Sequence, residues 1–150
     1  MKYRDNVCAV IRRKTDNSVL ICHRRGFPRD RGWQFPQGGI ENQADLIDEL
    51  KRELVEEIGT DNITVILVSP HVYRYTFPKG VKSKHRGYCG QEQRWVLVEL
   101  NCGDKAIKFN GADAEFDDFL WVSPKEALVQ VVDFKKDVYR QALRDLGLFF

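Results

Sequence analysis

The chain has 150 residues, of which 43% are hydrophobic and 31% charged, a balance typical of a folded protein and not of a disordered one. Lysine and arginine number 24 against 22 acidic residues, so the net charge of +2 argues against a uniformly basic nucleic-acid coat protein but leaves a local basic patch open. The apolar runs are too short for a membrane span or a signal segment. The four cysteines form no Cys-x-x-Cys pair, which favours a reducing compartment. We therefore expect one domain, residues 1–150, in the cytoplasm and without membrane contact.

The first third of the chain consists of β-rich runs separated by turn signals, and a helical pattern follows. Polar residues 15–17 predict a hairpin turn, Pro36 ends a short strand, and Gly38-Gly39 predicts an open stretch of backbone. In the helix, apolar residues recur at three- and four-residue spacing, and Gly59 supplies the stop. The predicted elements are, in chain order, strands at 6–13, 18–23 and 33–35 and a helix at 44–58.

The remainder of the chain predicts further strands and two closing helices. A proline at the first helical position after Ser123 marks the start of one helix, and Gly147 ends the other. Strands that surround one early helix, with helices at the end, indicate an α/β fold with a mixed sheet. The predicted elements are strands at 63–69, 73–77, 93–100 and 120–122, a helix from Ser123-Pro124, and a helix from about 133 to 146.

The predicted helix at 44–58 carries an unusual density of carboxylates. Glu53, Glu56 and Glu57 share one face, and Glu57 lies within the apolar stripe. A solvated charged face is the simpler interpretation, but like-charge neighbours on a helix each cost about 0.2–0.5 kcal/mol. The clear compensation nearby is Asp48 four residues before Arg52. Because hard divalent cations take oxygen ligands, converging carboxylates favour a metal site.

These residues fall in a spacing that resembles the Nudix hydrolase motif. Gly38 leads, Arg52-Glu53-Leu54 follows at the distance the motif requires, and Glu56-Glu57 and Gly59 complete the register. The sequence departs from the motif at Ala44, where the family has its first glutamate, and at Thr60, where it has an aliphatic residue. The first glutamate of the motif supports the loop and helix, so Ala44 puts stability and rate in doubt more than the metal site.

A closer resemblance, to the bacterial RNA pyrophosphohydrolase and dinucleoside polyphosphate hydrolase branch, covers nearly the whole chain. It implies a Nudix α/β/α sandwich and attack by water on a phosphoanhydride with Mg²⁺, for which Mn²⁺ or another divalent cation substitutes. The matching segments are Tyr3-Arg4-x-Asn6-Val7, Trp33 to Gly39, Gly90-Gln91-x-Gln93-Arg94-Trp95, Glu115-Phe116-Asp117 and Val131 to Arg140.

The resemblance also assigns candidate site residues. Gly38, Glu53, Glu56, Glu57 and Glu115 would bind the metal, with one glutamate, or a water that it holds, acting as base. Arg52 would orient the acidic cluster. From the residues alone, Glu115 is equally well explained as a surface loop acid.

Substrate-binding candidates follow from the same resemblance: Arg4, Arg25, Gln37, Tyr75, Gln91, Gln93, Phe134 and Lys135. Arginine grips phosphate as a bidentate fork, and an aromatic ring stacks on an unpaired base. The simpler alternatives remain open: surface positions for the arginines, strand packing for Tyr75 and core packing for Phe134. The basic residues Lys79, Lys82, Lys84, His85 and Arg86 suit a passing RNA backbone, or simply solubility.

The leading hypothesis is removal of pyrophosphate from 5′-triphosphorylated RNA, leaving a 5′-monophosphate that initiates mRNA decay. The alternative within the same chemistry is hydrolysis of dinucleoside polyphosphates such as diadenosine tetra- or pentaphosphate. A nucleotide- or RNA-binding regulator without catalysis is the alternative from another class, and Ala44 is its motive. The sequence identifies no protein partner.

Overall fold

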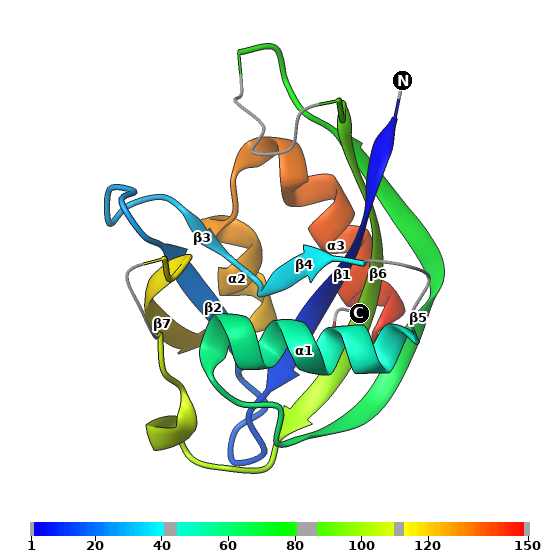
Figure 1. Cartoon of the computed structure of the whole chain (residues 1–150). Helices are drawn as coiled ribbons and strands as arrows, with labels where there is room; N and C mark the ends of the chain where they lie inside the picture. Colours follow the sequence, from blue (N-terminus) through cyan, green and yellow to red (C-terminus); the bar gives the residue numbers. More distant parts are fainter. Residues whose placement is uncertain (1, 41–44, 81–86, 110–112, 149–150) are drawn as a thin grey trace.

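The computed structural model describes residues 2–40, 45–80, 87–109 and 113–148 (Figure 1). Within these ranges the strands are β1 (Tyr3–Arg12), β2 (Val19–Arg24), β3 (Trp33–Gln34), β4 (Gln37–Gly39), β5 (Ile63–Thr76), β6 (Gly90–Leu100) and β7 (Phe116–Val122). The α-helices are α1 (Leu46–Ile58), α2 (Pro124–Gln130) and α3 (Lys136–Asp145), and short 3-10 turns cover Asp104–Ala106 and Asp133–Lys135.

The strands form one mixed sheet, as predicted. β1 lies at its centre and pairs in parallel with β6 and antiparallel with β2 and β4. β5 adds to the far side of β6, and β7 pairs with β2. No helix in the described part of the chain is long and apolar enough to cross a membrane.

Side chains that alternate along β1 divide the core into two layers. Val7, Ala9 and Ile11 pack with the apolar face of α1, whereas Cys8 and Val10 pack with α2 and α3. Helices therefore cover both faces of the sheet, with α1 on one side and α2 and α3 on the other (Figure 1). This arrangement is the predicted α/β/α sandwich.

Both ends of α1 have clear local causes. Asp45 is the N-cap, and its carboxylate accepts hydrogen bonds from the backbone N–H groups of Ile47 at 3.0 Å and Asp48 at 3.2 Å. Gly59 ends the helix in the left-handed conformation, with φ 83°. The helix thus begins at Leu46, two residues after its predicted start; Ala44 lies outside the described residues.

The predictions for the strands and the last helix need correction. Residues 63–69 and 73–77 were expected to be separate strands, but β5 is continuous and its pairing with β6 is irregular between Val68 and Val72, where Pro70 interrupts the ladder. The glycines expected to open the backbone at Gly38-Gly39 instead belong to β4 and pair with β1. The last helix starts with a 3-10 turn and becomes α-helical at Lys136. β1, β6 and β7 each begin three or four residues before their predicted starts.

Candidate active site

β4 and α1 meet at a contact that only glycine permits. A Cβ atom at Gly38 would lie 2.0 Å from Cδ of Glu53 and 2.1 Å from its Oε2, so the carboxylate rests directly against the backbone of β4. One residue earlier, the backbone N–H of Gln37 donates a 3.2 Å hydrogen bond to Oε2 of Glu57. Two of the predicted metal ligands are therefore held against the same short strand.

Arg52 is the charge partner of the acidic face. Its guanidinium donates to Glu49 at 2.7 Å, to Glu53 at 3.0 Å and to Glu56 at 3.0 Å. The sequence favoured Asp48 as its partner, but none of the ion pairs among the described residues joins the two, and Glu49 takes that place. The hydrogen bond to Glu49 is the main reason why the pKa of Arg52 is raised. One cation thus offsets the like-charge repulsion that makes this helix unusual.

Burial and mutual repulsion make the carboxylates hard to ionise without a cation. Burial raises the pKa of Glu53 to about 7, with Arg52 opposing the shift and Glu56 adding to it. The pKa of Glu57 is also raised well above its ordinary value, by burial and by the charges of Glu115 and Glu53. A bound cation reverses both effects because it stabilises the ionised carboxylates.

The carboxylates suit a divalent cation in chemistry although they are spread apart. Within the described ranges, no three His, Cys, Asp or Glu side chains surround a common point. Arg52 draws Glu53 and Glu56 to itself, and Glu56 is more than half exposed. The donor set of carboxylates and the glycine-lined strand beneath Glu53 fit an oxygen-preferring cation.

Glu115 reaches the site from a distant part of the chain. It lies exposed immediately before β7, and its backbone carbonyl accepts a 2.8 Å hydrogen bond from the N–H of Arg25. Its charge contributes to the raised pKa of Glu57, so the two carboxylates act on each other across the fold. The structure brings together two sequence-predicted residues, Glu115 and Arg25, through their backbones.

Sheet register assembles a second group of predicted residues. Arg4 of β1 pairs with Gln91 of β6, and Gln91 pairs with Tyr75 of β5, so the three lie abreast across neighbouring strands. Arg4 also extends to β4, where a Cβ atom at Gly39 would lie 2.2 Å from its Nη2. Its positive charge acts on both Glu53 and Tyr75. Arg4 therefore connects this row of residues to the carboxylates.

The buried cation Lys135 lies beside this row, close to two polar atoms that belong to Tyr75 and Gln91. The hydroxyl of Tyr75 and Oε1 of Gln91 are buried and have no hydrogen-bond partner of good geometry among the described residues, although the side chain of Gln37 lies near the hydroxyl. Nζ of Lys135 lies 5.7 Å from the ring centre of Tyr75, and none of the ion pairs in the described ranges includes it. Burial, reinforced by the charge of Arg24, lowers the pKa of Lys135 to about 8. Unsatisfied groups of this kind suit an anionic, polar ligand. Arg24 was not among the candidates predicted from the sequence, although its neighbour Arg25 was.

Gln93 and Gln37 have partners within the protein. Gln93 is completely buried, and its amide nitrogen donates to Oδ1 of Asn6 at 2.9 Å and to Oε1 of Gln37 at 2.6 Å. Its Oε1 accepts from Nε1 of Trp95 at 3.2 Å. This network fixes the side chain of Gln37, whose backbone N–H holds Glu57. Substrate contact by Gln93 and Gln37 remains a prediction, and their contacts in the structure fit positioning.

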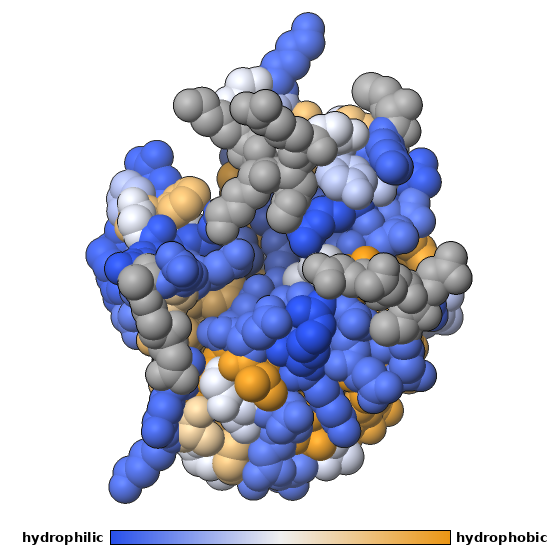
Figure 2. Space-filling model, viewed as in Figure 1, coloured by the Kyte–Doolittle hydropathy of each residue, from blue (hydrophilic) through white to orange (hydrophobic). Residues whose placement is uncertain are grey.

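Two further predictions have different outcomes. Phe134 is half-buried and its ring centre lies 5.8 Å from that of Tyr75, next to the unpartnered polar atoms. Stacking on a base stays a prediction. Of the predicted basic loop, Lys79 is exposed, whereas Lys82, Lys84, His85 and Arg86 lie outside the described residues. The surface over α1 is mainly hydrophilic (Figure 2).

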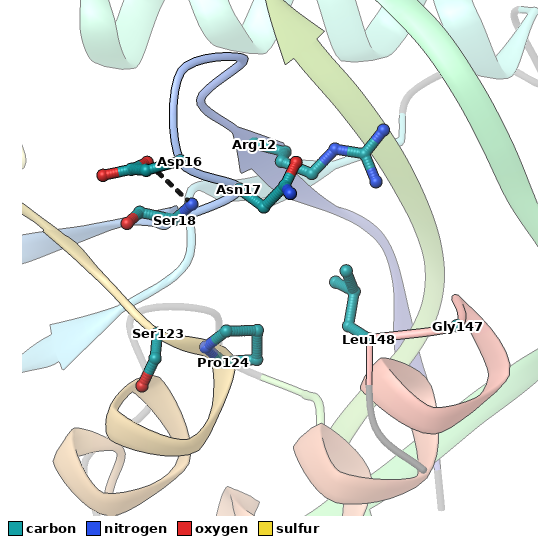
Figure 3. A pocket seen from close by; sticks show the side chains of 8 residues that line it. All are labelled: Arg12, Asp16, Asn17, Ser18, Ser123, Pro124, Gly147 and Leu148. Atoms are coloured by element: carbon teal, nitrogen blue, oxygen red, sulfur yellow. Dashed lines mark hydrogen bonds between the residues drawn. The ribbon is translucent and has the colours of Figure 1, made fainter.

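A separate hollow of about 420 Å³ lies at the other end of β1, between the first hairpin turn, the start of α2 and the end of α3 (Figure 3). Its charged side chains have partners: Arg12 pairs with Glu99 at 2.9 Å and Asp16 with Arg13 at 2.6 Å. The carboxylates of α1 therefore remain the candidate active site.

Comparisons with known proteins agree with this geometry. The model of the NUDIX domain matches residues 2–144. A protein of Histophilus somni named RNA pyrophosphohydrolase is 40% identical over 98% of this chain and 77% of its own length. One with the same name from Campylobacter jejuni is 37% identical over 95% of this chain and 91% of its own length.

Solved structures show the same fold at low sequence identity. The E. coli dihydroneopterin triphosphate pyrophosphohydrolase superposes with a TM-score of 0.70 at 18% identity, covering 96% of this chain and 99% of its own. A C. elegans Ap4A hydrolase superposes with a TM-score of 0.67 at 19% identity, covering 97% of this chain and 99% of its own. Together with the family match over nearly the whole length, these comparisons show that the chain belongs to the Nudix family of hydrolases.

Proposed function

We propose that the protein is an RNA 5′ pyrophosphohydrolase, which removes pyrophosphate from 5′-triphosphorylated RNA and leaves a 5′-monophosphate. One observation carries the proposal: the acidic face of α1 lies beside a buried, cation-bearing group with unpartnered polar atoms at Tyr75 and Gln91. The first group suits a metal, and the second suits the phosphates and ribose of a nucleotide. Relatives named RNA pyrophosphohydrolase, at 36–40% identity over most of the chain, support this choice.

The carboxylates and one backbone group would hold the metal. Glu53, Glu56, Glu57 and Glu115 would supply oxygen ligands, and Gly38 the backbone carbonyl beside them. Divalent cations, of which we propose Mg²⁺ with Mn²⁺ as a substitute, neutralise phosphate charge and favour ionisation of a bound water. In the reaction, the oxygen of water bonds to phosphorus, the anhydride P–O bond breaks, and pyrophosphate leaves.

One glutamate must take the proton from the attacking water. Glu57 fits this task because the N–H of Gln37 holds its Oε2, and Oε1 would then take the proton. Burial places its pKa above the ordinary value, so it binds a proton more readily than an exposed carboxylate. Arg52, tied to three carboxylates, keeps the acidic face aligned while charge moves.

The cationic side of the site would bind the rest of the substrate. Arg4 would grip a phosphate with its guanidinium, and Lys135 would gain the anionic partner that the protein does not supply. Oε1 of Gln91 is an acceptor, so it would take a hydrogen bond from a ribose hydroxyl or a base N–H. Phe134, half-exposed beside Tyr75, would stack on the first base. We propose the cytoplasm as the location of the protein, which RNA as substrate and the four free cysteines support.

The experiment compares Glu57→Gln and Glu53→Gln with wild type on 5′-triphosphorylated RNA in excess Mg²⁺. Each substitution removes one charge with little change in shape, and we expect kcat to fall by about 10²-fold or more. Asp48→Asn is the matched control, because Asp48 is exposed on the same helix and its side chain contacts none of the proposed ligands. If either Gln variant retains the wild-type rate, that residue is neither ligand nor base. Tight RNA binding by wild-type protein without turnover would instead indicate the binding regulator.

A further inference from the structure

A buried histidine lies on β2, where the pairing of β2 with β7 becomes irregular. His23, the fifth residue of β2, is 1% exposed, and its Nδ1 lies 2.6 Å from Oδ1 of Asp117 while its Nε2 lies 3.0 Å from the carbonyl oxygen of Pro28. A carboxylate and a carbonyl both accept hydrogen bonds, so both ring nitrogens must donate. The geometry therefore requires the imidazolium form. Burial opposes that form, but the bonds to Pro28 and Asp117 outweigh it and raise the pKa of His23.

The contact with Asp117 sits in a β-bulge. His23 pairs with Asp118 and Arg24 pairs with Phe116, so Asp117 is the extra residue of β7 at this point. A bulge bends its strand and re-aims the neighbouring side chains, and bulges are common next to active sites. Here the side chain of the extra residue contacts the ring of His23, so a side-chain hydrogen bond joins the two strands at the bulge.

The next contacts after the bulge belong to the site. The N–H of Arg25 donates to the carbonyl of Glu115 at 2.8 Å, two residues beyond His23 on one strand and two before Asp117 on the other. Arg24 lies between them and acts electrostatically on Lys135. A change in the bulge would therefore be expected to move Arg25, a phosphate-binding candidate, together with Glu115, a proposed metal ligand.

The second ring nitrogen fastens the loop that follows β2. By holding the carbonyl of Pro28, His23 ties residues 26–32 back onto the sheet. The ring also packs on Trp33, with centroids 5.0 Å apart, and Nε1 of Trp33 donates to the carbonyl of Arg29 at 2.9 Å. One side chain therefore joins the strand, the bulge and the loop.

We propose that His23 is a positioning residue for the reaction: its two hydrogen bonds hold Arg24 and Arg25 in fixed register with Glu115. It touches neither substrate nor metal in this account. The inference rests on the proposed function, since it takes Glu115 as a metal ligand, and it takes Arg25 as the phosphate-binding residue that the sequence resemblance predicts. A solely structural histidine would stabilise the fold without affecting either partner of the site.

The test uses His23→Gln, whose N–H donors both sit on one nitrogen and so cannot take the places of the two separate ring nitrogens, and Asp117→Asn, which retains the shape but removes the charge. Asp118→Asn is the control, because Asp118 is adjacent but pairs with Arg29 at the surface. We expect His23→Gln and Asp117→Asn each to raise KM for 5′-triphosphorylated RNA about tenfold and to weaken Mn²⁺ binding severalfold. The double variant should be no worse than either single one, because both remove the same contact.

The proposal is overturned if the variants melt at a lower temperature but keep wild-type KM and Mn²⁺ affinity. Additive effects in the double variant would overturn it as well. Mn²⁺ binding, measured by titration calorimetry on the protein alone, separates this failure from that of the proposed function. If wild type turns over no RNA, the proposed function fails, while the Mn²⁺ comparison still decides whether His23 positions the metal ligand. Should His23→Gln fail to fold, Asp117→Asn and its comparison with Asp118→Asn decide the matter.

Discussion

Replacing Gly38 by alanine tests the contact on which the site is built. The new Cβ would lie 2.0 Å from Cδ of Glu53, whereas ordinary contact begins at 3.4 Å, so the carboxylate must move by more than about 1 Å. The neighbour that must yield is the end of a side chain and not backbone, and Gly38 has no positive φ. The fold should therefore survive while Glu53, a proposed metal ligand, is displaced.

A misplacement of about 1 Å in a catalytic site costs on the order of 10²-fold in rate, and we expect that loss in kcat. The melting temperature should remain near the wild-type value. Alanine gives the unfolded chain slightly less conformational freedom than glycine does, and this offsets the cost of moving the Glu53 side chain. The assay is steady-state hydrolysis of 5′-triphosphorylated RNA in Mg²⁺, with thermal unfolding measured in parallel.

Two other glycines provide controls for Gly38→Ala. Gly103→Ala adds a methyl group to open space at an ordinary φ, and it should leave both rate and stability unchanged. Gly39→Ala pushes on the guanidinium of Arg4 in place of Glu53, so it should raise KM more than it lowers kcat. A folded Gly38→Ala variant with wild-type kcat would refute the assignment of Glu53 and the role of the glycine.

Three further changes probe separate parts of the account. Lys135→Met should raise KM for RNA yet stabilise the substrate-free protein by about 1–3 kcal/mol, because a buried charge disappears. In wild type, the pKa of Lys135 in the folded protein is about 8, below the ordinary 10.5, so between these pH values the unfolded state binds more protons and stability rises with pH. Over the same range KM for RNA should rise, because Lys135 loses its charge. A KM that is flat from pH 7 to 9.5 would contradict this. Phe134→Ala should raise KM for RNA more than KM for a dinucleoside polyphosphate, because stacking on a base contributes about 1–3 kcal/mol of binding free energy. Equal increases in both KM values would mean that Phe134 has only a packing role. Tyr73→Phe removes hydrogen bonds to Ser69 and Asp145 and should lower the free energy of unfolding by about 1–2 kcal/mol in urea titrations without changing KM; an unchanged midpoint would mean that the bonds contribute nothing.

The parts of the fold that depend on local spacing could be predicted from sequence. The helix that carries Glu53 and Glu57 follows from its apolar period and from Gly59, and its acidic face follows from the same geometry. The α/β/α layering and the mixed sheet followed from the resemblance and from the order of elements. Local patterns did not reveal that β5 is continuous through Pro70, because the bulge is stabilised by pairing with a strand much later in the chain.

The parts of the site that depend on register could not be predicted in this way. Nothing within β1 indicates that Arg4 faces Gln91, since a one-residue shift in pairing would turn every side chain to the other face. Arg24 was missed because nothing in the local sequence distinguishes it from the adjacent Arg25, and its effect on Lys135 depends on the tertiary fold. Helix spacing alone did not decide between Glu49 and Asp48 as partner of Arg52, because residues three and four positions apart are both neighbours on a helix face.

The measurement that tests the central proposal most directly is turnover of a short 5′-triphosphorylated RNA beside diadenosine tetraphosphate, at matched concentrations in Mg²⁺. We expect a higher kcat/KM for the RNA, with release of pyrophosphate and a 5′-monophosphate product, and loss of both activities in Glu57→Gln. A higher kcat/KM for diadenosine tetraphosphate would contradict the assignment to RNA and make the protein a dinucleoside polyphosphate hydrolase.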